Sequence, residues 1–505
     1  MLDFIAELPR KILSRRPLAY LILFLVVGAY FLWLNSTPSF TDPDSFYHAK
    51  IAELIKDFGP VKDFHWLPFT TLDDVYIDHH FLYHLILIPF LLVFNPLLAV
   101  KISAVIFAAL AILVFQWLLD KFKIKHSLAY TILLLFVHQF IFRINLAKIP
   151  SLSLIFLLCF IYLLFTNKNR WSWPMFALSF SYVWLYGGWP IMLGIALVYF
   201  LISLKAKLFS STMAGIICGL VINPYFPQNI LFYWQQTIQI GLINFKSIIN
   251  VGGEWYGMSF FSLVQYDLFI IILLILALLI FFIYLKKQDS KNWTLLIISI
   301  IFFILTLKSQ RNIEYFIPLV LLFSSFTISD FLEFKKINLI SQIVKLYFKY
   351  QTITLLFIIL SVLYLPIIIG ANFNGLKENL RKNYNFNQFT GIVAWLKENS
   401  QEGDIVFHDN WDDWPVLFYH NSYNRYIIGL DPTFMYLKNE RQYWSWKNIT
   451  TGLTSKNICA IIKDEFAAHY VFVKIGNEKL KNNLDQDNLC QLVYYDKDGF
   501  IYKIN

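Results

Sequence analysis

Long runs of apolar residues recur along most of the chain and are separated by short polar segments. A helix needs about 20 predominantly apolar residues to cross the hydrocarbon core of a bilayer, and several runs approach that length. The pattern therefore predicts a polytopic α-helical membrane domain over residues 1–370, with about 11 to 13 transmembrane helices. The spans that we place are 18–35, 98–118, 127–142, 151–167, 172–187, 188–204, 209–223, 267–285, 293–308, 313–333 and 352–370.

Basic residues in the short loops of this region indicate its orientation. They form clusters between the apolar runs, at 121–125, 168–170, 205–207, 286–287 and 335–336. Because positively charged loops stay on the cytoplasmic side, a cytoplasmic N-terminus places all of these clusters inside. Outward inserts are then expected at about 36–80 and 224–266. The apolar segment 81–94 is too short for a confident span, and crossing would reverse every later loop, so we interpret it as re-entrant or interfacial.

The pattern changes after residue 370. Residues 389–398 have apolar positions at helical spacing, and short β-rich runs follow at 404–407, 426–428 and 470–475, with a hairpin over 491–504. The sequence therefore predicts an α/β domain over residues 371–505, on the periplasmic or extracellular side of the plasma membrane.

Composition supports the membrane assignment and excludes a nucleic-acid binder. Hydrophobic residues make up 58% of the 505 residues, and charged residues only 15%. The net charge of +9 does not come from the terminal domain, where 15 Lys and Arg stand against 16 Asp and Glu. Cys459 and Cys490 both lie in that domain, where the outward environment allows a disulfide.

The first candidate for chemistry is the segment Asp42-Pro43-Asp44, a few residues after the first span. Two carboxylates at the membrane surface suit an enzyme that binds a metal and handles a lipid phosphate. The alternative is that these residues only cap a surface helix starting near Ser45.

Other polar residues recur on the same side of the membrane. They are Asp78-His79-His80 with His84, Arg143, Glu254, Arg311 with Glu314, and Asn410-Trp411-Asp412-Asp413-Trp414. Each alone also has an ordinary interpretation, such as a helix cap, a loop acid or a headgroup contact. Together they suit transfer of a group from a lipid phosphate, in which Mg²⁺ or Mn²⁺ and an arginine neutralise the departing phosphate while a carboxylate takes a proton from the acceptor.

These motifs resemble a known family. The chain has a first span followed by Asp44-Ser45-Phe46-Tyr47-His48, then a polar insert, many spans, a Gly-Glu-Trp loop at Glu254 and a terminal Trp411-Asp412 module. This order of motifs resembles that of the catalytic subunit of oligosaccharyltransferase. The chain looks like a divergent, single-subunit prokaryotic member of the GT-C membrane glycosyltransferases.

The resemblance implies a role for each matched residue. Asp44 would bind the metal and the acceptor amide, and Glu254 would reach the acceptor nitrogen. Trp411 and Asp412, with Asp413 beside them, would bind the acceptor, and Arg311 and Arg143 would bind the donor phosphate.

The sequence departs from the family in the next outward loop, where the family has a second acidic motif. Residues 142–151 contain no acid, so we expect His79 and His80 to complete the metal site with Asp42 and Asp44. The terminal module also has Asp413-Trp414 where the family has Tyr-Gly.

The resemblance predicts an enzyme that moves a sugar or glycan from a polyprenyl-(pyro)phosphate donor to an acceptor on the outer face of the membrane. Protein asparagine is one acceptor, and a lipid or cell-envelope glycan is the other. A third interpretation is a transporter without catalysis, which predicts charges buried along a path within the spans. Here the charges gather at span ends and in inserts.

Overall fold

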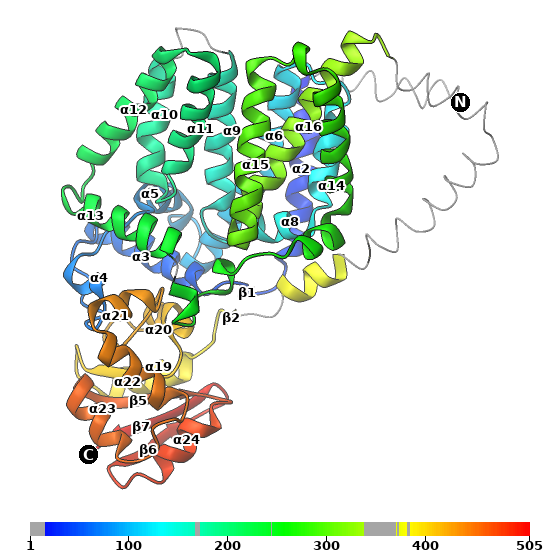
Figure 1. Ribbon diagram of the computed structural model, residues 1–505. Coiled ribbons are helices and arrows are strands. Elements are labelled where there is room, and N and C mark those ends of the chain that lie inside the picture. Colours follow the sequence, from blue (N-terminus) through cyan, green and yellow to red (C-terminus); the bar gives the residue numbers. More distant parts are fainter. Residues whose placement is uncertain (1–15, 167–171, 244, 338–369, 371–372, 381–383) are drawn as a thin grey trace.

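The computed structural model describes residues 16–166, 172–243, 245–337, 370, 373–380 and 384–505. A bundle of helices forms one part of the molecule, and a smaller domain that contains a sheet lies at one end of the bundle (Figure 1). Three parts of the predicted architecture lie outside the described residues. They are residues 1–15, the predicted span at 352–370 apart from residue 370, and most of the boundary between the two predicted domains.

The predicted helical membrane domain is confirmed. Among the described residues, five helices are long and apolar enough to cross a membrane, or six if one bent pair counts as a single span. Several further apolar helices are shorter. The bundle consists of α2 (Arg16–Leu34), α6 (Pro96–Lys121), α7 (Ser127–Leu135), α8 (His138–Asn145), α9 (Pro150–Thr166), α10 (Ser172–Leu185), α11 (Pro190–Ser203), α12 (Ala206–Val221), α14 (Phe260–Ile283), α15 (Ser290–Lys308) and α16 (Ile313–Phe334).

The predicted span at 127–142 is not one straight helix, but a broken span or a re-entrant segment. This stretch forms two helices, α7 and α8, with a bend of 76° between them, and Val137 at the junction has an extended backbone. The reason is the polarity of α8, which buries Arg143 and Asn145. A charged side chain is costly in the hydrocarbon core, so the helix turns to bring Arg143 to carboxylate partners at the end of the bundle.

Both predicted inserts lie at the end of the bundle next to the sheet domain (Figure 1). The first contains β1 (Ser39–Phe40), α3 (Asp44–Phe58) and α4 (Thr71–Asp74), and leads into α5 (Phe81–Leu91). The second contains α13 (Gln228–Trp234), η2 (Gln235–Ile243), η3 (Phe245–Ser247) and η4 (Gly253–Trp255). Helix α5 has 11 residues, which is too few to span a bilayer, and it packs against α3 and α6.

The C-terminal region has the predicted α/β character. Its five-stranded sheet has the order β4-β3-β5-β7-β6, in which β3 is parallel to β4 and β5 and the predicted C-terminal hairpin adds β7 and β6 antiparallel. The elements are β2 (Tyr384–Asn385), α19 (Thr390–Asn399), β3 (Ile405–His408), η7 (Trp411–Asp413), α20 (Trp414–His420), β4 (Arg425–Tyr426), α21 (Thr433–Lys438), α22 (Glu440–Thr450), α23 (Ile458–Phe466), β5 (Ala468–Lys474), α24 (Glu478–Asp485), β6 (Cys490–Tyr495) and β7 (Gly499–Ile504).

The first insert attaches this domain to the bundle. Strand β1 pairs with β2 in antiparallel register, and Trp66 Nε1 donates to the carbonyl of Ser422 at 2.8 Å. Lys438 of α21 forms an ion pair with Asp74 of α4 at 2.7 Å. These contacts hold the C-terminal domain against the first insert, which carries Asp42 and Asp44 at the start of α3.

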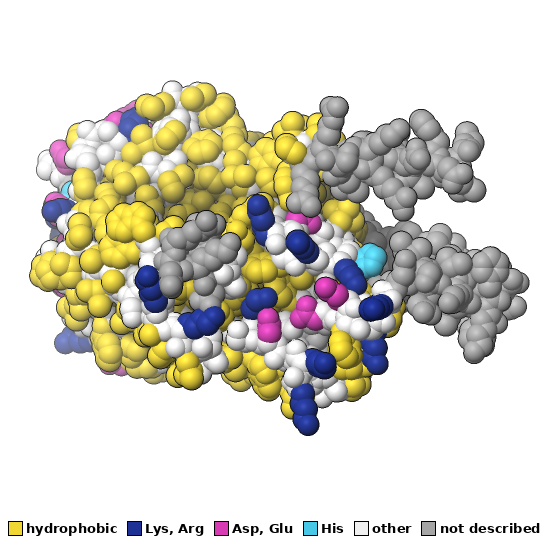
Figure 2. Space-filling model, turned by 90° about the horizontal axis from the view of Figure 1, so that it is seen from above, with side chains coloured by type: hydrophobic (Ala, Val, Ile, Leu, Met, Phe, Trp, Pro, Cys, Tyr) yellow, Lys and Arg dark blue, Asp and Glu magenta, His cyan; other side chains and the backbone are white. Residues whose placement is uncertain are grey.

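Basic loops gather at the other end of the bundle. Lys125 N donates to Ser329 Oγ at 3.0 Å, and Lys291 lies over the ring of Phe122 at 5.7 Å. Seen from this end, Lys and Arg side chains are spread over the surface (Figure 2). The basic loops and the two inserts thus lie at opposite ends of the bundle.

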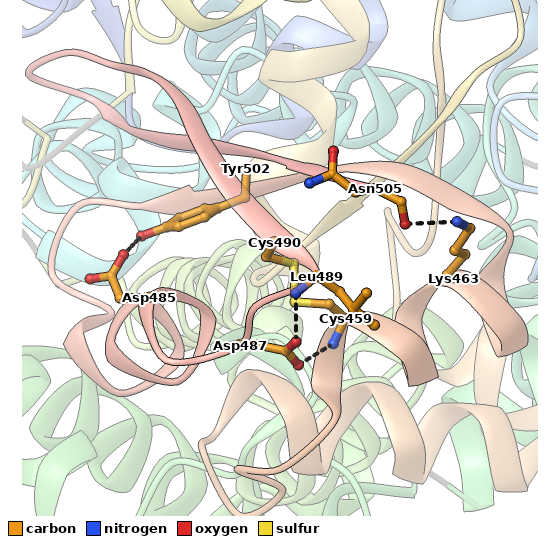
Figure 3. The surroundings of a disulfide bond; sticks show 8 residues. All are labelled: Cys459, Lys463, Asp485, Asp487, Leu489, Cys490, Tyr502 and Asn505. Carbon is orange, nitrogen blue, oxygen red and sulfur yellow. Dashed lines mark hydrogen bonds between the residues drawn. A yellow bond between two sulfur atoms is a disulfide. The ribbon is translucent and has the colours of Figure 1, made fainter.

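Cys459 and Cys490 form a disulfide that joins α23 to the start of β6 (Figure 3). Asp487 lies beside it, where its carboxylate accepts from the backbone N–H groups of Cys459 and Leu489. The disulfide therefore closes a loop of the C-terminal domain onto the sheet.

Candidate active site

The two acids after the first span contact one lysine. Asp42 Oδ1 accepts from the backbone N–H of Asp44 at 3.0 Å at the start of α3, whose N-cap residue is Pro43 and makes no side-chain capping hydrogen bond. The other oxygen, Asp42 Oδ2, lies 2.7 Å from Lys148 Nζ, and Asp44 Oδ2 lies 2.7 Å from the same nitrogen. Lys148 comes from the short segment between α8 and α9, the loop in which the sequence shows no acid.

Burial and charge act in opposite directions on this group. Burial raises the pKa of Asp44 to about 7, and Lys148 opposes part of that shift. Burial alone would lower the pKa of Lys148, but Asp42 and Asp44 raise it above its usual value. Asp44 is thus a carboxyl group that can exchange a proton near neutral pH, and Lys148 stays a cation.

The predicted metal ligands do not assemble into one group. In the part of the chain that the structure describes, no three or more His, Cys, Asp or Glu side chains are placed to hold a metal ion. Mg²⁺ requires near-octahedral coordination, and here the two acids share a lysine instead. The donor set does not fit Mg²⁺ or Mn²⁺, and we derive no step through a metal.

The side chains of Asp78, His84 and His48 form a hydrogen-bonded network beside the histidines predicted as substitute ligands. His80 joins this network only through its backbone N–H, and its buried Nε2 has no hydrogen-bond partner among the described residues. Asp78 Oδ1 accepts from the backbone N–H of His80 at 3.0 Å, and Asp78 Oδ2 contacts His84 Nδ1 at 2.7 Å. The other nitrogen of His84 lies 2.8 Å from His48 Nδ1. The ring of His80 stacks on Tyr186, with ring centroids 5.9 Å apart.

Arg143 and Arg311 approach one carboxylate from different elements. Arg143 donates from Nη1 to Glu254 Oε2, and Arg311 Nη1 lies 3.6 Å from Glu254 Oε1. Arg311 also lies over the ring of Trp255 at 4.5 Å and donates to the hydroxyl of Tyr186 at 3.3 Å. Burial alone would raise the pKa of Glu254, but the two arginines lower it well below its usual value, so Glu254 is ionised at neutral pH.

Two cavities meet at these residues. The first cavity, about 140 Å³, is lined by His79, His80 and Arg311, which do not line the second cavity. The second cavity, about 640 Å³, is lined by Asp42, Trp411 and Asp412. Residues that line both cavities are Asp44, Arg143, Lys148, Glu254, Trp255, Leu430 and Asp431. The fold therefore places three acids and two cations where a molecule in one cavity meets a molecule in the other.

The two acids of the Trp411-Asp412-Asp413 segment differ in position, because Asp412 lines the second cavity and Asp413 does not. Asp412 Oδ2 accepts from the hydroxyl of Tyr384 at 2.7 Å, and burial raises the pKa of Asp412 to about 6. Asp413 is buried in the C-terminal domain, where Lys474 Nζ contacts its Oδ1 at 2.6 Å. The 3₁₀ turn at η7 points these adjacent acids in different directions, so Asp413 is placed as an ion-pair partner rather than as a lining residue of the second cavity.

Sequence reasoning missed the position of Lys148 and the roles of Tyr186 and Tyr384. One signal for Lys148 was present, because a lysine in an outward loop departs from the rule that keeps basic residues inside. No comparable signal marks the tyrosines, which reach the site from α10's C-terminal end and from β2.

No protein-family model matches the sequence, and neither does any curated protein. Solved structures do resemble it. The archaeal oligosaccharyltransferase AglB from Archaeoglobus fulgidus, in complex with an inhibitory peptide and a dolichol-phosphate, aligns with a TM-score of 0.63 and 14% identity over 96% of this chain and 74% of that one. ArnT from Cupriavidus metallidurans, bound to undecaprenyl phosphate, aligns with a TM-score of 0.53 and 12% identity over 96% of this chain and 98% of ArnT.

A third structure, the arabinofuranosyltransferase AftD from Mycobacteria, aligns with a TM-score of 0.58 and 12% identity over 95% of this chain and 40% of AftD. At these identities the likeness concerns the fold. The fold predicted from the motifs is thereby confirmed, and this chain has the GT-C fold of membrane glycosyltransferases.

Proposed function

We propose that this protein is a glycosyltransferase that moves a sugar or glycan from a polyprenyl-phosphate or polyprenyl-pyrophosphate donor to an acceptor at the outer end of the bundle. The observation that carries the proposal is the shared wall of the two cavities. Asp44, Arg143, Lys148 and Glu254 line both, so a donor in one cavity and an acceptor in the other would meet at groups suited to the reaction.

The first cavity suits the phosphate end of the donor. Lys148 and Arg311 bring positive charge to it, and Tyr186 adds a hydroxyl. Cations fixed in a water-poor site stabilise charge that grows on a leaving phosphate. The likeness to AglB with a dolichol-phosphate and to ArnT with undecaprenyl phosphate supports a prenyl phosphate as the donor class.

The second cavity suits the acceptor because it is larger and lies between the bundle and the C-terminal domain. Trp411 offers an aromatic face, and Asp412 offers a carboxylate to a polar group of the acceptor. Protein asparagine is the acceptor suggested by the likeness to AglB, whose structure contains an inhibitory peptide. A hydroxyl of a lipid or an envelope glycan is the other acceptor that the same carboxylates can serve.

The reaction balances with groups of this chain. The bond between the anomeric carbon of the sugar and the phosphate oxygen breaks, and the prenyl (pyro)phosphate leaves with the electron pair. A bond forms between the anomeric carbon and the acceptor nitrogen or oxygen. The acceptor's proton passes to Asp44, which lines both cavities and whose pKa burial raises above its usual value.

A transfer assay on the purified protein in detergent tests the proposal. The assay supplies lipid-linked glycans from the host and a fluorescent Asn-x-Thr peptide, with Mn²⁺ or with a chelator, and includes Asp44→Ala. A glycopeptide that requires Asp44 supports protein asparagine as the acceptor. Donor loss that requires Asp44 without a glycopeptide supports a lipid or glycan acceptor. Donor turnover that Asp44→Ala leaves unchanged, or no turnover with any acceptor, contradicts the proposal.

A further inference from the structure

Lys148 has the position of a fixed cation at the point where the two cavities meet. Its Nζ lies 2.7 Å from one oxygen of Asp42 and 2.7 Å from one oxygen of Asp44. An ammonium group has three N–H donors, and these two carboxylates take two of them. Lys148 lines both cavities, so the third donor is available to a group that binds beside Asp44.

This position competes with a divalent metal ion. Mg²⁺ bound to the same two oxygens at about 2.1 Å would lie against the ammonium group and would be repelled by it. Removal of Lys148 from between the acids is unfavourable, because it would leave a lysine that is only 13% exposed without its partners. The ammonium group of Lys148 therefore already serves as the counter-ion of Asp42 and Asp44.

We infer that Lys148 takes the place of a metal ion in this protein and binds the donor phosphate directly, so that donor binding requires no divalent cation. The donor's identity as a prenyl phosphate rests on the proposed function. The position of the cation rests on the contacts of Lys148 alone. An ammonium group matches the role, because its hydrogen bonds to phosphate oxygens are charge-assisted.

A purely structural role for Lys148 makes a different prediction. A lysine that only neutralises Asp42 and Asp44 would affect folding when removed, without a specific effect on phosphate affinity or on metal uptake. Two binding measurements separate these roles. Lys62, an exposed lysine of the first insert, which also carries Asp42 and Asp44, provides a control for the change of charge.

The first measurement is uptake of Mn²⁺, followed by electron paramagnetic resonance of the free ion, in metal-free detergent buffer. Wild type and Lys62→Glu should leave the Mn²⁺ signal unchanged. Lys148→Glu places a third carboxylate beside Asp42 and Asp44 and should bind about one Mn²⁺ per chain. Saturable Mn²⁺ binding by wild type that Asp44→Ala abolishes would overturn the inference. So would a folded Lys148→Glu variant that binds no Mn²⁺.

The second measurement is the affinity for farnesyl phosphate by calorimetry in the presence of EDTA. Wild type should bind with EDTA present, Lys148→Met should bind about tenfold more weakly, and Lys148→Arg should retain most of the affinity. Lys62→Met should match wild type. An unchanged affinity in Lys148→Met, or loss of wild-type binding on addition of EDTA, would overturn the inference. Neither measurement requires sugar transfer, so failure of the transfer assay would contradict the proposed function without affecting these results.

Discussion

Arg143 of α8 and Glu254 of the second insert form an ion pair on the wall between the two cavities, although 111 residues separate them in the sequence. Arg143 also donates from Nε to Glu314 at 2.8 Å. All three nitrogens of the Arg143 guanidinium thus already contact a carboxylate oxygen. Arg311 makes only a longer contact of 3.6 Å with Glu254 and stacks on Trp255, so its charge is more available to a phosphate.

Replacement of Arg311 should therefore weaken binding of the donor specifically. Arg311→Ala is expected to lower the affinity for a prenyl phosphate about tenfold or more, because a charge-assisted contact to the phosphate is lost. Calorimetric titration of the purified variant measures this. Arg441→Ala is the control, since the Arg441 side chain is 89% exposed on α22. Unchanged donor affinity in Arg311→Ala would assign the phosphate to Lys148 and Arg143 instead.

Glu254→Gln should affect turnover more than donor binding. Its carboxylate is ionised and lines both cavities, so we expect its main interaction to form as the acceptor reacts. The turnover number should fall about tenfold or more, while the donor dissociation constant changes by less than about threefold. Kinetics under donor saturation and direct donor titration give the two values. Equal losses in both would mean that Glu254 has no role specific to the transition state.

The raised pKa of Asp412 predicts a pH-dependent effect on stability. Below about pH 4 the carboxyl is protonated in the folded and the unfolded chain. Between pH 4 and 6 the unfolded chain loses this proton while the folded protein, with a pKa of about 6, retains it, so wild type loses stability as pH rises. Asp412→Asn cannot titrate and should gain about 2–4 °C in apparent melting temperature relative to wild type between pH 4 and 7.

Thermal unfolding of wild type and Asp412→Asn at several pH values checks this prediction. Asp464→Asn, at an exposed position of α23, is the control and should show no such trend. A difference between Asp412→Asn and wild type that is constant with pH would contradict the assigned burial of Asp412.

Reduction of the disulfide should destabilise the C-terminal domain. Cys459 and Cys490 are 31 residues apart, and closing a loop of that size contributes about 3–4 kcal/mol in the chain-entropy model. Dithiothreitol should lower the melting temperature by several degrees, as measured by tryptophan fluorescence. The Cys459→Ser/Cys490→Ser variant should melt at the lower temperature with or without reductant. No shift on reduction, with both thiols shown to be free, would contradict the prediction.

The sequence predicted much of this architecture because its strongest signals are local. Apolar runs located the helices, and period-two runs located β3, β5 and the final hairpin. Orientation by basic loops also placed Asp44, Glu254, Arg311 and Trp411 on one side, and the structure brings them to two adjoining cavities.

What the sequence could not predict depends on contacts between distant segments. The bend at Val137 has no Pro or Gly signal and follows from the partners that Arg143 finds in Glu254 and Glu314. Asp412 and Asp413 are adjacent acids in the sequence, but of the two only Asp412 lines the second cavity. The lack of an acid in residues 142–151 suggested histidine ligands, whereas Lys148 of that same loop lies between the acids.

The most direct test of the account is a cryo-electron microscopy structure of the protein with a polyprenyl phosphate. The account predicts the phosphate in the first cavity, within about 4 Å of Arg311 and Lys148, with the second cavity open to an acceptor. The phosphate in the second cavity beside Trp411 and Asp412, or bound away from both cavities, would contradict the central claim.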